Sequence, residues 1–163
     1  MKEYFFLFLI LCSSFVMAEN GENDKGILPS AVYLWKIDLR IERITLFLTP
    51  GIRSKAVKEL EFAKEREQEL EALGLDATVD LVDLLENNYD FNVQNAEDLG
   101  ARLKDEDQKE VFGLVAEAKS KHLEVLERVR LKVPDKASIK IQDIIDRKIF
   151  IPAIRVGDEL NDD

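Results

Sequence analysis

Cysteine and histidine are almost missing from this chain of 163 residues, which has one of each. Cys12 lies in an apolar N-terminal segment, so residues 19–163 carry neither a disulfide framework nor a thiolate metal site. The one histidine, His122, cannot supply the two or three ligands of a zinc hydrolase. A Ser-His-Asp system is not excluded by count, but the chain lacks a recognisable nucleophile elbow, and it has no Gly-rich phosphate loop. We therefore expect no enzyme, no cofactor and no dedicated metal site.

Basic residues are also in the minority. The 23 Lys and Arg residues against 33 Asp and Glu residues give a net charge of −10. Nucleic acid and anionic lipid both require clustered Lys and Arg, so the balance argues against either as a partner. A cationic partner or a divalent metal would be attracted. We favour the simpler interpretation that the acidity keeps a secreted protein soluble.

The N-terminal segment has the pattern of a secretory signal peptide. Lys2 is followed by uncharged residues from Tyr4 to Ala18, and Ala18 is a small residue suited to cleavage. As a helix this stretch would reach about 22 Å, which is short of the roughly 30 Å hydrocarbon core. We predict removal of residues 1–18 and an extracytoplasmic protein with a flexible linker at residues 19–26. An uncleaved anchor is the alternative, and only then do we expect membrane association.

Apolar residues recur at helical spacing through the rest of the chain and predict five helices. They are expected at residues 30–48, 52–73, 77–104, 105–132 and 136–148. No segment shows sustained alternation with period two, so the sequence predicts an all-α antiparallel bundle over residues 27–148. The second, third and fourth helices should form a long three-helix core. Residues 149–163, which include Pro152, are expected to form an extended tail ending in acidic disorder.

Two of the expected helices have unusual compositions. The first is apolar almost all round, so it requires cover from the C-terminal tail or from a partner, and we favour the tail. The third contains NNYDFNVQN, which is poor in strong helix formers but keeps the apolar period. An EF-hand at Asp90 is excluded, because its sixth position is Asn95 and its twelfth is Ala101.

Three polar residues are candidates for a shared layer inside the bundle. His122 lies on the apolar stripe of the fourth helix, and antiparallel folding brings it level with about Asn87 and brings Arg66 level with about residues 82–86. Arg66, Glu86 and His122 are therefore expected to share one polar layer. We favour a structural role that fixes helix register. Binding of an anion or metal, or a response to pH, is the alternative.

The carboxylates of the second helix are interpreted as a solvated face. Glu65 and Glu69 are four positions apart, as are Glu67 and Glu71, so each pair lies on one face of the helix. Acidic residues are so abundant that such pairs arise by coincidence. A weak metal site on them is the less favoured hypothesis.

The order of motifs resembles a known family. Ile27-Leu28-Pro29 with Tyr33 is followed by Ala63-x-x-Arg66, and then by His122-Leu123-x-Val125-Leu126-x-x-Val129-x-x-x-Val133-Pro134. This is similar to a family of secreted prokaryotic proteins known only as a domain of unknown function. The resemblance covers about residues 27–147 and implies export and a helical fold, without catalytic residues.

From these observations we expect a secreted, non-enzymatic helical module of the cell envelope that acts through binding or structure. It would present a helix face, or a polar groove near His122, to an unidentified protein partner. The alternative is an envelope stress or metal-sensing protein that uses carboxylates and His122 as weak ligands. A hydrolase is the third hypothesis.

Overall fold

The computed structural model describes residues 32–159, and side chains over residues 37–149. The helices, in chain order, are α2 (Val32–Leu48), α3 (Ile52–Glu71), α4 (Val79–Gly100), α5 (Asp105–Arg130) and α6 (Asp135–Glu159). Within this part of the chain there is no strand, so the predicted all-α class is confirmed. The predicted signal peptide and linker lie outside the described residues.

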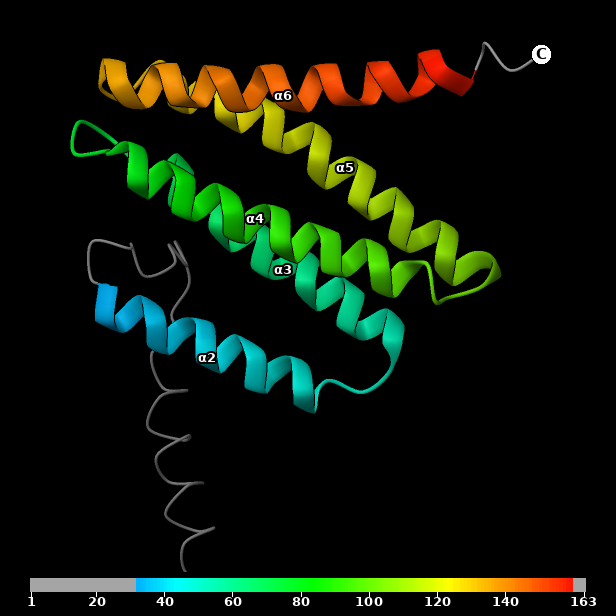
Figure 1. The fold of residues 1–163 in the computed structure, drawn as a ribbon. Coiled ribbons are helices and arrows are strands. Elements are labelled where there is room, and N and C mark those ends of the chain that lie inside the picture. Colours follow the sequence, from blue (N-terminus) through cyan, green and yellow to red (C-terminus); the bar gives the residue numbers. More distant parts are fainter. Residues whose placement is uncertain (1–31, 160–163) are drawn as a thin grey trace, which may run out of the picture.

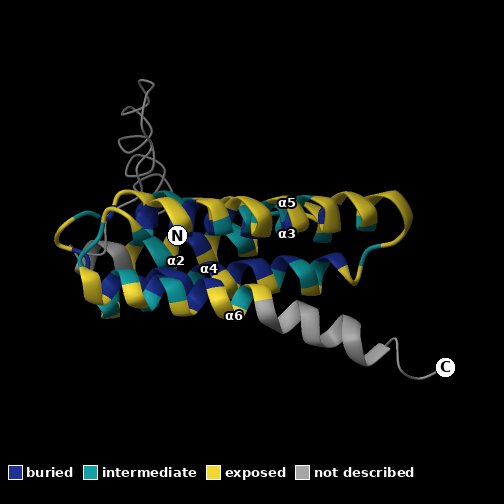
Figure 2. Ribbon diagram, turned by 90° about the horizontal axis from the view of Figure 1, so that it is seen from above, coloured by how far each residue is buried: buried dark blue, intermediate teal, exposed yellow. Residues whose placement is uncertain are grey.

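The helices are arranged around a three-helix core. α3, α4 and α5 all pack against one another, as the sequence predicted. α2 packs against α3 at one side of this core, and α6 packs against α4 and α5 at the other (Figure 1). Burial is concentrated where these helices face each other, and their outer faces are exposed (Figure 2). None of the helices in the described part combines the length and the apolarity needed to cross a bilayer.

Local sequence explains where the two longest core helices begin. The Thr78 side chain accepts a hydrogen bond from the backbone N–H of Leu81 at 3.2 Å and so caps α4. α5 starts with Asp105, Glu106 and Asp107, and its last turn contains Arg128 and Arg130. Both placements match the helix dipole, which favours negative charge at the start and positive charge at the end.

The apolar stripes form two core clusters. One lies toward the α3–α4 turn and includes the docked half of α6; it consists of Leu70, Leu73, Ala77, Val82, Leu85, Val125, Leu126, Val129, Ala137, Ile141, Ile144 and Ile145. The other lies toward the α4–α5 turn and consists of Ala56, Ala63, Tyr89, Val93, Ala96, Val111 and Val115. His122 is fully buried on the same stripe of α5, between Val115 and Val125.

The prediction of an extended tail after Lys148 was wrong over residues 149–159, because α6 continues to Glu159. Pro152 removes one backbone donor, but this loss does not end α6. Ile141, Ile144 and Ile145 dock the first half of α6 on the core. Once that half is formed, further turns add one hydrogen bond per residue without a new nucleus. Residues 160–163, the end of the predicted acidic tail, lie outside the described residues.

The same helix does not cover α2. α6 packs on α4 and α5, at the side of the core away from α2 (Figure 1). The expectation that the C-terminal tail shields the apolar first helix is therefore not met by α6.

Candidate functional site

His122 lies at the centre of a buried polar cluster, which we call the His122 site. Its Nε2 atom is 2.8 Å from Glu86 Oε2, and its Nδ1 atom is 3.6 Å from Glu67 Oε1. The Tyr89 ring stacks on the imidazole, with centroids 3.6 Å apart and an angle of 10° between the rings. His122 is only 1% exposed. Helices α3, α4 and α5 each contribute a side chain to this cluster.

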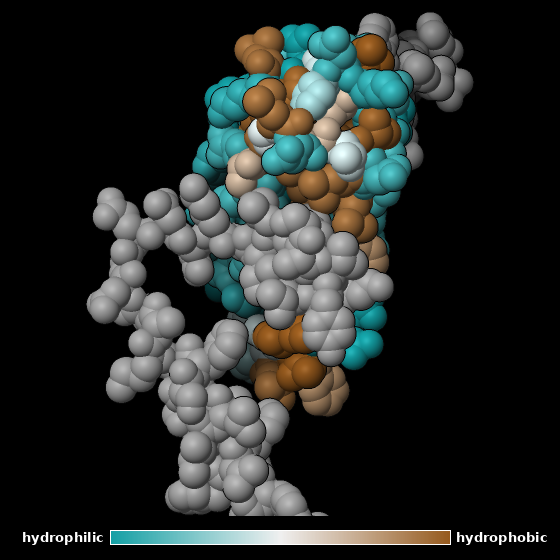
Figure 3. All heavy atoms as spheres, turned by 90° about the vertical axis from the view of Figure 1, so that its left-hand side faces the viewer, coloured by the Kyte–Doolittle hydropathy of each residue, from teal (hydrophilic) through white to brown (hydrophobic). Residues whose placement is uncertain are grey.

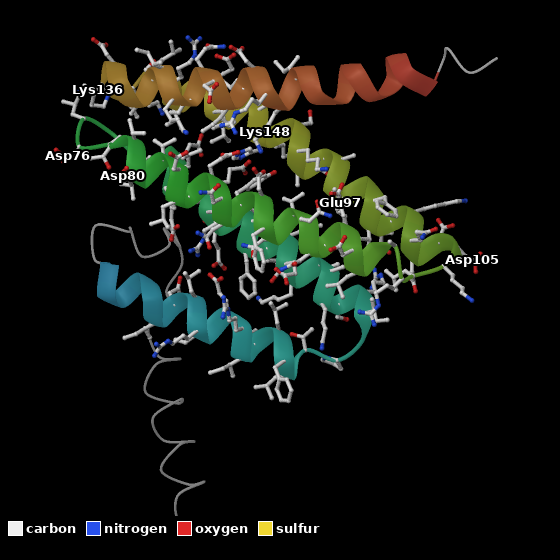
Figure 4. All side chains as sticks on the ribbon, in the orientation of Figure 1. Asp76, Asp80, Glu97, Asp105, Lys136 and Lys148 are labelled. Carbon is white, nitrogen blue, oxygen red and sulfur yellow. The ribbon has the colours of Figure 1, made fainter. Side chains whose placement is uncertain are left out.

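A lysine from α6 completes the His122 site. Lys148 Nζ lies 2.6 Å from Glu86 Oε1 and 2.5 Å from Asp90 Oδ1. Figure 4 shows Lys148 extending from α6 into the space between α6 and α4. The ammonium group also lies 5.4 Å from the centroid of the Tyr89 ring, within reach of a cation–π contact. Glu86 is thus held between two basic groups.

These contacts determine the charge states of the site. Burial acts to raise the pKa of Glu86, but His122 and Lys148 outweigh it and hold that pKa below its usual range. Burial acts to lower the pKa of His122, and the Glu67 and Glu86 carboxylates outweigh it and raise that pKa. An ionised Glu86 can only accept hydrogen bonds, so Nε2 of His122 must carry the proton between them. The cluster therefore joins α4 and α5 by a buried hydrogen bond that becomes an ion pair when His122 is protonated.

A cleft of about 860 Å³ opens beside the His122 site, between α4, α5 and α6. Its lining is part apolar and part charged: Asp83, Glu86, Asn87, Tyr89, Asp90, Val93, Lys119, Ser120, His122, Leu123, Lys140, Ile144, Arg147 and Lys148. Several of its charges are already paired, as in Lys119 with Glu97 at 2.6 Å and Lys140 with Asp83 at 2.8 Å. The cleft therefore offers an apolar floor and a rim of charge pairs.

Arg66 forms a second buried cluster, the Arg66 site, between α3 and α2. Its Nη2 atom lies 2.8 Å from Glu42 and 3.4 Å from Asp38, both on α2. Within α3 it lies 3.6 Å from Glu65, and its Nε atom lies 3.4 Å from Glu69. One guanidinium therefore faces four carboxylates within 3.6 Å.

Burial and the neighbouring carboxylates change the pKa of Glu42. Burial is the largest cause and raises its pKa to about 7. Arg66 partly offsets this, while Asp38, Glu65 and Glu69 raise it further. Oxygen atoms of Asp38, Glu42 and Glu65 lie within 4.8 Å of one another, close enough to serve as ligands for one cation. In this structure the Arg66 guanidinium supplies positive charge at that place.

The predicted polar layer is therefore divided between two sites. Glu86 and His122 meet as expected, but the contacts of Arg66 run to α2 and along α3. Arg66 follows the stripe residue Ala63 by three positions, which places it at the edge of the stripe, where α2 docks. The sequence analysis did not identify Glu67 or Lys148 as members of the His122 site. Glu67 was interpreted as part of a solvated face, but its side chain is only 16% exposed and lies against His122. A signal was present, because Glu67 lies on the apolar stripe of α3, four positions after Ala63 and three before Leu70.

The interpretation of Glu65 and Glu69 as a solvated face was wrong for Glu69, which is 1% exposed. α3 buries two faces, one on α4 and α5 and one on α2. The second face carries Arg66 and Glu69, which are both buried, and Arg66 contacts Glu42 and Asp38 on α2. An apolar stripe in the sequence marks only the face that packs on α4 and α5. Charged residues on the face toward α2 were therefore not recognised as buried.

The polar middle of α4 also has a place in the structure. Asn95 donates a hydrogen bond to Glu59 on α3 at 3.0 Å, and Asn92 is buried. Burial raises the pKa of Glu59, and the bond from Asn95 opposes that rise. α4 stays continuous through this stretch, as predicted, because its apolar period is kept.

Comparison with known proteins gives a family and no activity. The family model described as Domain of unknown function (DUF5667) matches residues 26–136. The match takes in α2 to α5 and ends at the start of α6, so Lys148 lies outside it. No curated protein and no solved structure matches the chain.

Proposed function

Because the chain belongs to this family, whose description names no activity, we propose a function from the geometry of the structure and the pattern of the N-terminal segment. The protein is an exported, non-enzymatic binding module of the cell envelope, and the cleft between α4, α5 and α6 is its binding surface. The observation that carries this proposal is the position of the 860 Å³ cleft beside the buried hydrogen bond between His122 and Glu86.

The burial of His122 supports binding rather than catalysis. A general base must come within hydrogen-bond reach of the proton that it removes. His122 is 1% exposed, one ring face lies against Tyr89, and both nitrogens face carboxylates. Such a group holds the wall of the cleft in place and leaves recognition to the residues at the rim.

The composition of the cleft indicates a protein segment as the ligand. Apolar contacts are available from Val93, Leu123 and Ile144. The lining also carries both signs of charge, as in Asp83 and Arg147. Interfaces with proteins combine an apolar centre with a polar rim in this way. The N-terminal signal pattern supports export, so the partner should be a protein of the envelope.

Photo-crosslinking from the cleft tests this proposal. Ser120 is exposed and lines the cleft, whereas Glu124 is exposed one turn further along α5, outside the lining residues. A benzoylphenylalanine at position 120 should give a discrete crosslinked product in the envelope fraction of producing cells, and one at position 124 should not. Equal products from both positions, or none from position 120, would contradict the proposal.

A second candidate function, divalent metal sensing, is favoured by the closeness of Asp38, Glu42 and Glu65. A divalent ion would have to displace Arg66, which already lies 2.8 Å from Glu42. Melting curves with and without Ca²⁺ or Mn²⁺ decide the matter, because an ion that binds the native state raises the melting temperature. A rise that disappears in Glu42→Gln supports metal sensing, and the absence of any rise excludes it.

A further inference from the structure

α2 differs from an ordinary surface helix, because its aliphatic stripe faces away from the bundle. Ile37, Ile41, Ile44 and Leu48 recur at helical spacing, and their exposed fractions increase from 39% to 71% along the helix. Phe47, beside them, is 83% exposed. We call the outward surface made by these five residues together with Arg40 and Arg43 the α2 face.

The acidic residues of the same helix point inward. Among the described side chains of α2, Glu42 alone is buried, and it pairs with Arg66 together with Asp38. A surface helix normally buries its apolar stripe and leaves its charges in water. A continuous apolar patch that is left outside marks a contact surface. Figure 3 shows hydrophobic side chains gathered at the lower end of the bundle, where α2 lies.

The charges that remain on the α2 face are positive. Arg40 and Arg43 are exposed, whereas both acidic residues of the helix are turned toward Arg66. In an antiparallel pair of copies packed through this stripe, the arginine edge of one copy would meet the arginine edge of the other. The pattern therefore disfavours that arrangement and favours a partner with negative charge around an apolar interior.

We propose that the α2 face docks on an anionic lipid membrane, with α2 lying flat in the interface. Isoleucine, leucine and phenylalanine would enter the boundary of the acyl chains, and the two arginines would meet lipid phosphates. This proposal departs from the expectation from sequence, which took the net charge of −10 as evidence against anionic lipid and tied membrane association to an uncleaved signal segment. The net charge does not prevent docking. Exposed charges more than about 8 Å away are largely screened at physiological ionic strength, and most of the acidic residues lie on other helices.

The position of α2 makes this docking compatible with the rest of the fold. α2 lies at one edge of the bundle, and α6, which forms a wall of the cleft, lies at the opposite edge (Figure 1). A membrane on the α2 face would therefore leave the cleft open. The docking proposal does not depend on what the cleft binds.

Quenching by brominated lipid tests the docking directly. The chain has one tryptophan, Trp35, so Trp35→Phe with Phe47→Trp moves the sole fluorophore onto the α2 face. Vesicles of phosphatidylglycerol and phosphatidylcholine with brominated acyl chains should quench this tryptophan strongly, and pure phosphatidylcholine vesicles should quench it weakly. Flotation of the unsubstituted chain with the same vesicles measures its affinity for the vesicles without the introduced tryptophan.

Matched charge variants separate the α2 face from other contributions. Each arginine near an anionic surface contributes about fivefold to affinity, so Arg40→Gln with Arg43→Gln should weaken vesicle binding about 25-fold. Lys132→Gln with Lys136→Gln removes the same charge from exposed positions near the start of α6 and should leave binding unchanged. All variants keep residues 1–31 intact, so any binding by the N-terminal segment cancels in the comparison.

Three outcomes would overturn the proposal. In the first, light scattering shows a dimer that Ile44→Asp converts to a monomer, and brominated vesicles do not quench the tryptophan at position 47. This result would assign the α2 face to a second copy of the chain. Another is absence of quenching in a monomer, which means that the face does not reach lipid. The third is equal loss of affinity in the α2 and α6 charge variants, which means that binding follows net charge alone.

Discussion

Two buried glutamates, Glu42 and Glu86, are each paired with a basic residue in this molecule, and their pKa values move in opposite directions. Glu86 lies between His122 and Lys148, and its pKa is lowered. Glu42 shares Arg66 with three other carboxylates, and its pKa is raised to about 7. Burial alone would raise both. The difference shows that the ratio of cations to carboxylates determines whether a buried charge is stabilised.

The two sites also differ in what holds them. The His122 site lies inside the three-helix core, next to apolar residues on α4, α5 and α6. The Arg66 site joins α3 to α2, a helix in which Glu42 is the one buried side chain among those described. We therefore expect the His122 site to open only with the whole bundle and the Arg66 site to open when α2 alone is released.

The largest effect should come from breaking the His122 site. His122→Ala leaves a cavity beside Tyr89 and removes one of the two partners of Glu86, and we expect a loss of about 3–4 kcal/mol. His122→Gln should recover part of this by keeping a hydrogen bond. Urea unfolding measures both variants. A loss below about 1 kcal/mol for His122→Ala would show that the cluster contributes little.

The contribution of His122 should also depend on pH. Its folded-state pKa is raised, so the stabilisation is fully present below the unfolded value of about 6.5 and is lost as the pH rises through the folded value. The gap in stability between wild type and His122→Gln should therefore be wider at pH 6 than at pH 9. A gap that is independent of pH would mean that the pKa of His122 is the same in the folded and unfolded states, and a narrower gap at pH 6 would mean that the folded imidazole stays neutral.

Arg66→Met should cost less, about 2 kcal/mol, although Arg66 is also fully buried. Removing one partner of a buried pair normally costs about 3–5 kcal/mol, but here release of α2 returns Glu42 and Asp38 to water and limits the loss. Urea unfolding measures the loss, and proteolysis at α2 should accelerate in the variant. A loss as large as that of His122→Ala would remove the distinction between the sites.

Glu42→Gln should stabilise the protein by about 1 kcal/mol at pH 8 and by less at pH 5. The folded pKa of Glu42 exceeds the unfolded value of 4.5, so the folded state binds more protons and loses stability as the pH rises from 4.5 to about 7. The neutral variant lacks this loss. Thermal melts of both proteins across that range give the comparison, and parallel curves would contradict it.

The smallest effect is expected for Glu65→Ala. Its side chain is 40% exposed and lies 3.6 Å from Arg66, which already has closer carboxylate partners. A surface ion pair contributes about 0–1 kcal/mol. We expect a change within about 0.5 kcal/mol in urea unfolding. A larger loss would mean that Glu65 is essential to the Arg66 site.

The sequence predicted features that depend on apolar periodicity. Val111, Val115, Val125 and Val129 mark one face of α5, and His122 falls on that face, so its burial and its meeting with Glu86 followed from helix geometry. The same geometry predicted the three-helix core. These features follow from spacing along single helices and from the short turns between them.

Other features depended on contacts that periodicity does not encode. Lys148 reaches Glu86 from α6, and the direction of α6 relative to α4 could not be derived from its stripe. Glu69 looked solvated because charged residues on a helix usually face water, but it is 1% exposed and lies 3.4 Å from Arg66. Pro152 was interpreted as a helix end, although the docked half of α6 propagates through it.

Hydrogen exchange resolved by helix, at pH 7 under native conditions, tests the difference between the two sites most directly. Amides of α2 should exchange through a local opening of low free energy, while amides of α4 and α5 around Glu86 and His122 should exchange only with global unfolding. Glu42→Gln should slow exchange in α2 and leave α4 and α5 unchanged. Equal protection of α2 and α4 in the wild-type protein, unaffected by Glu42→Gln, would contradict the account.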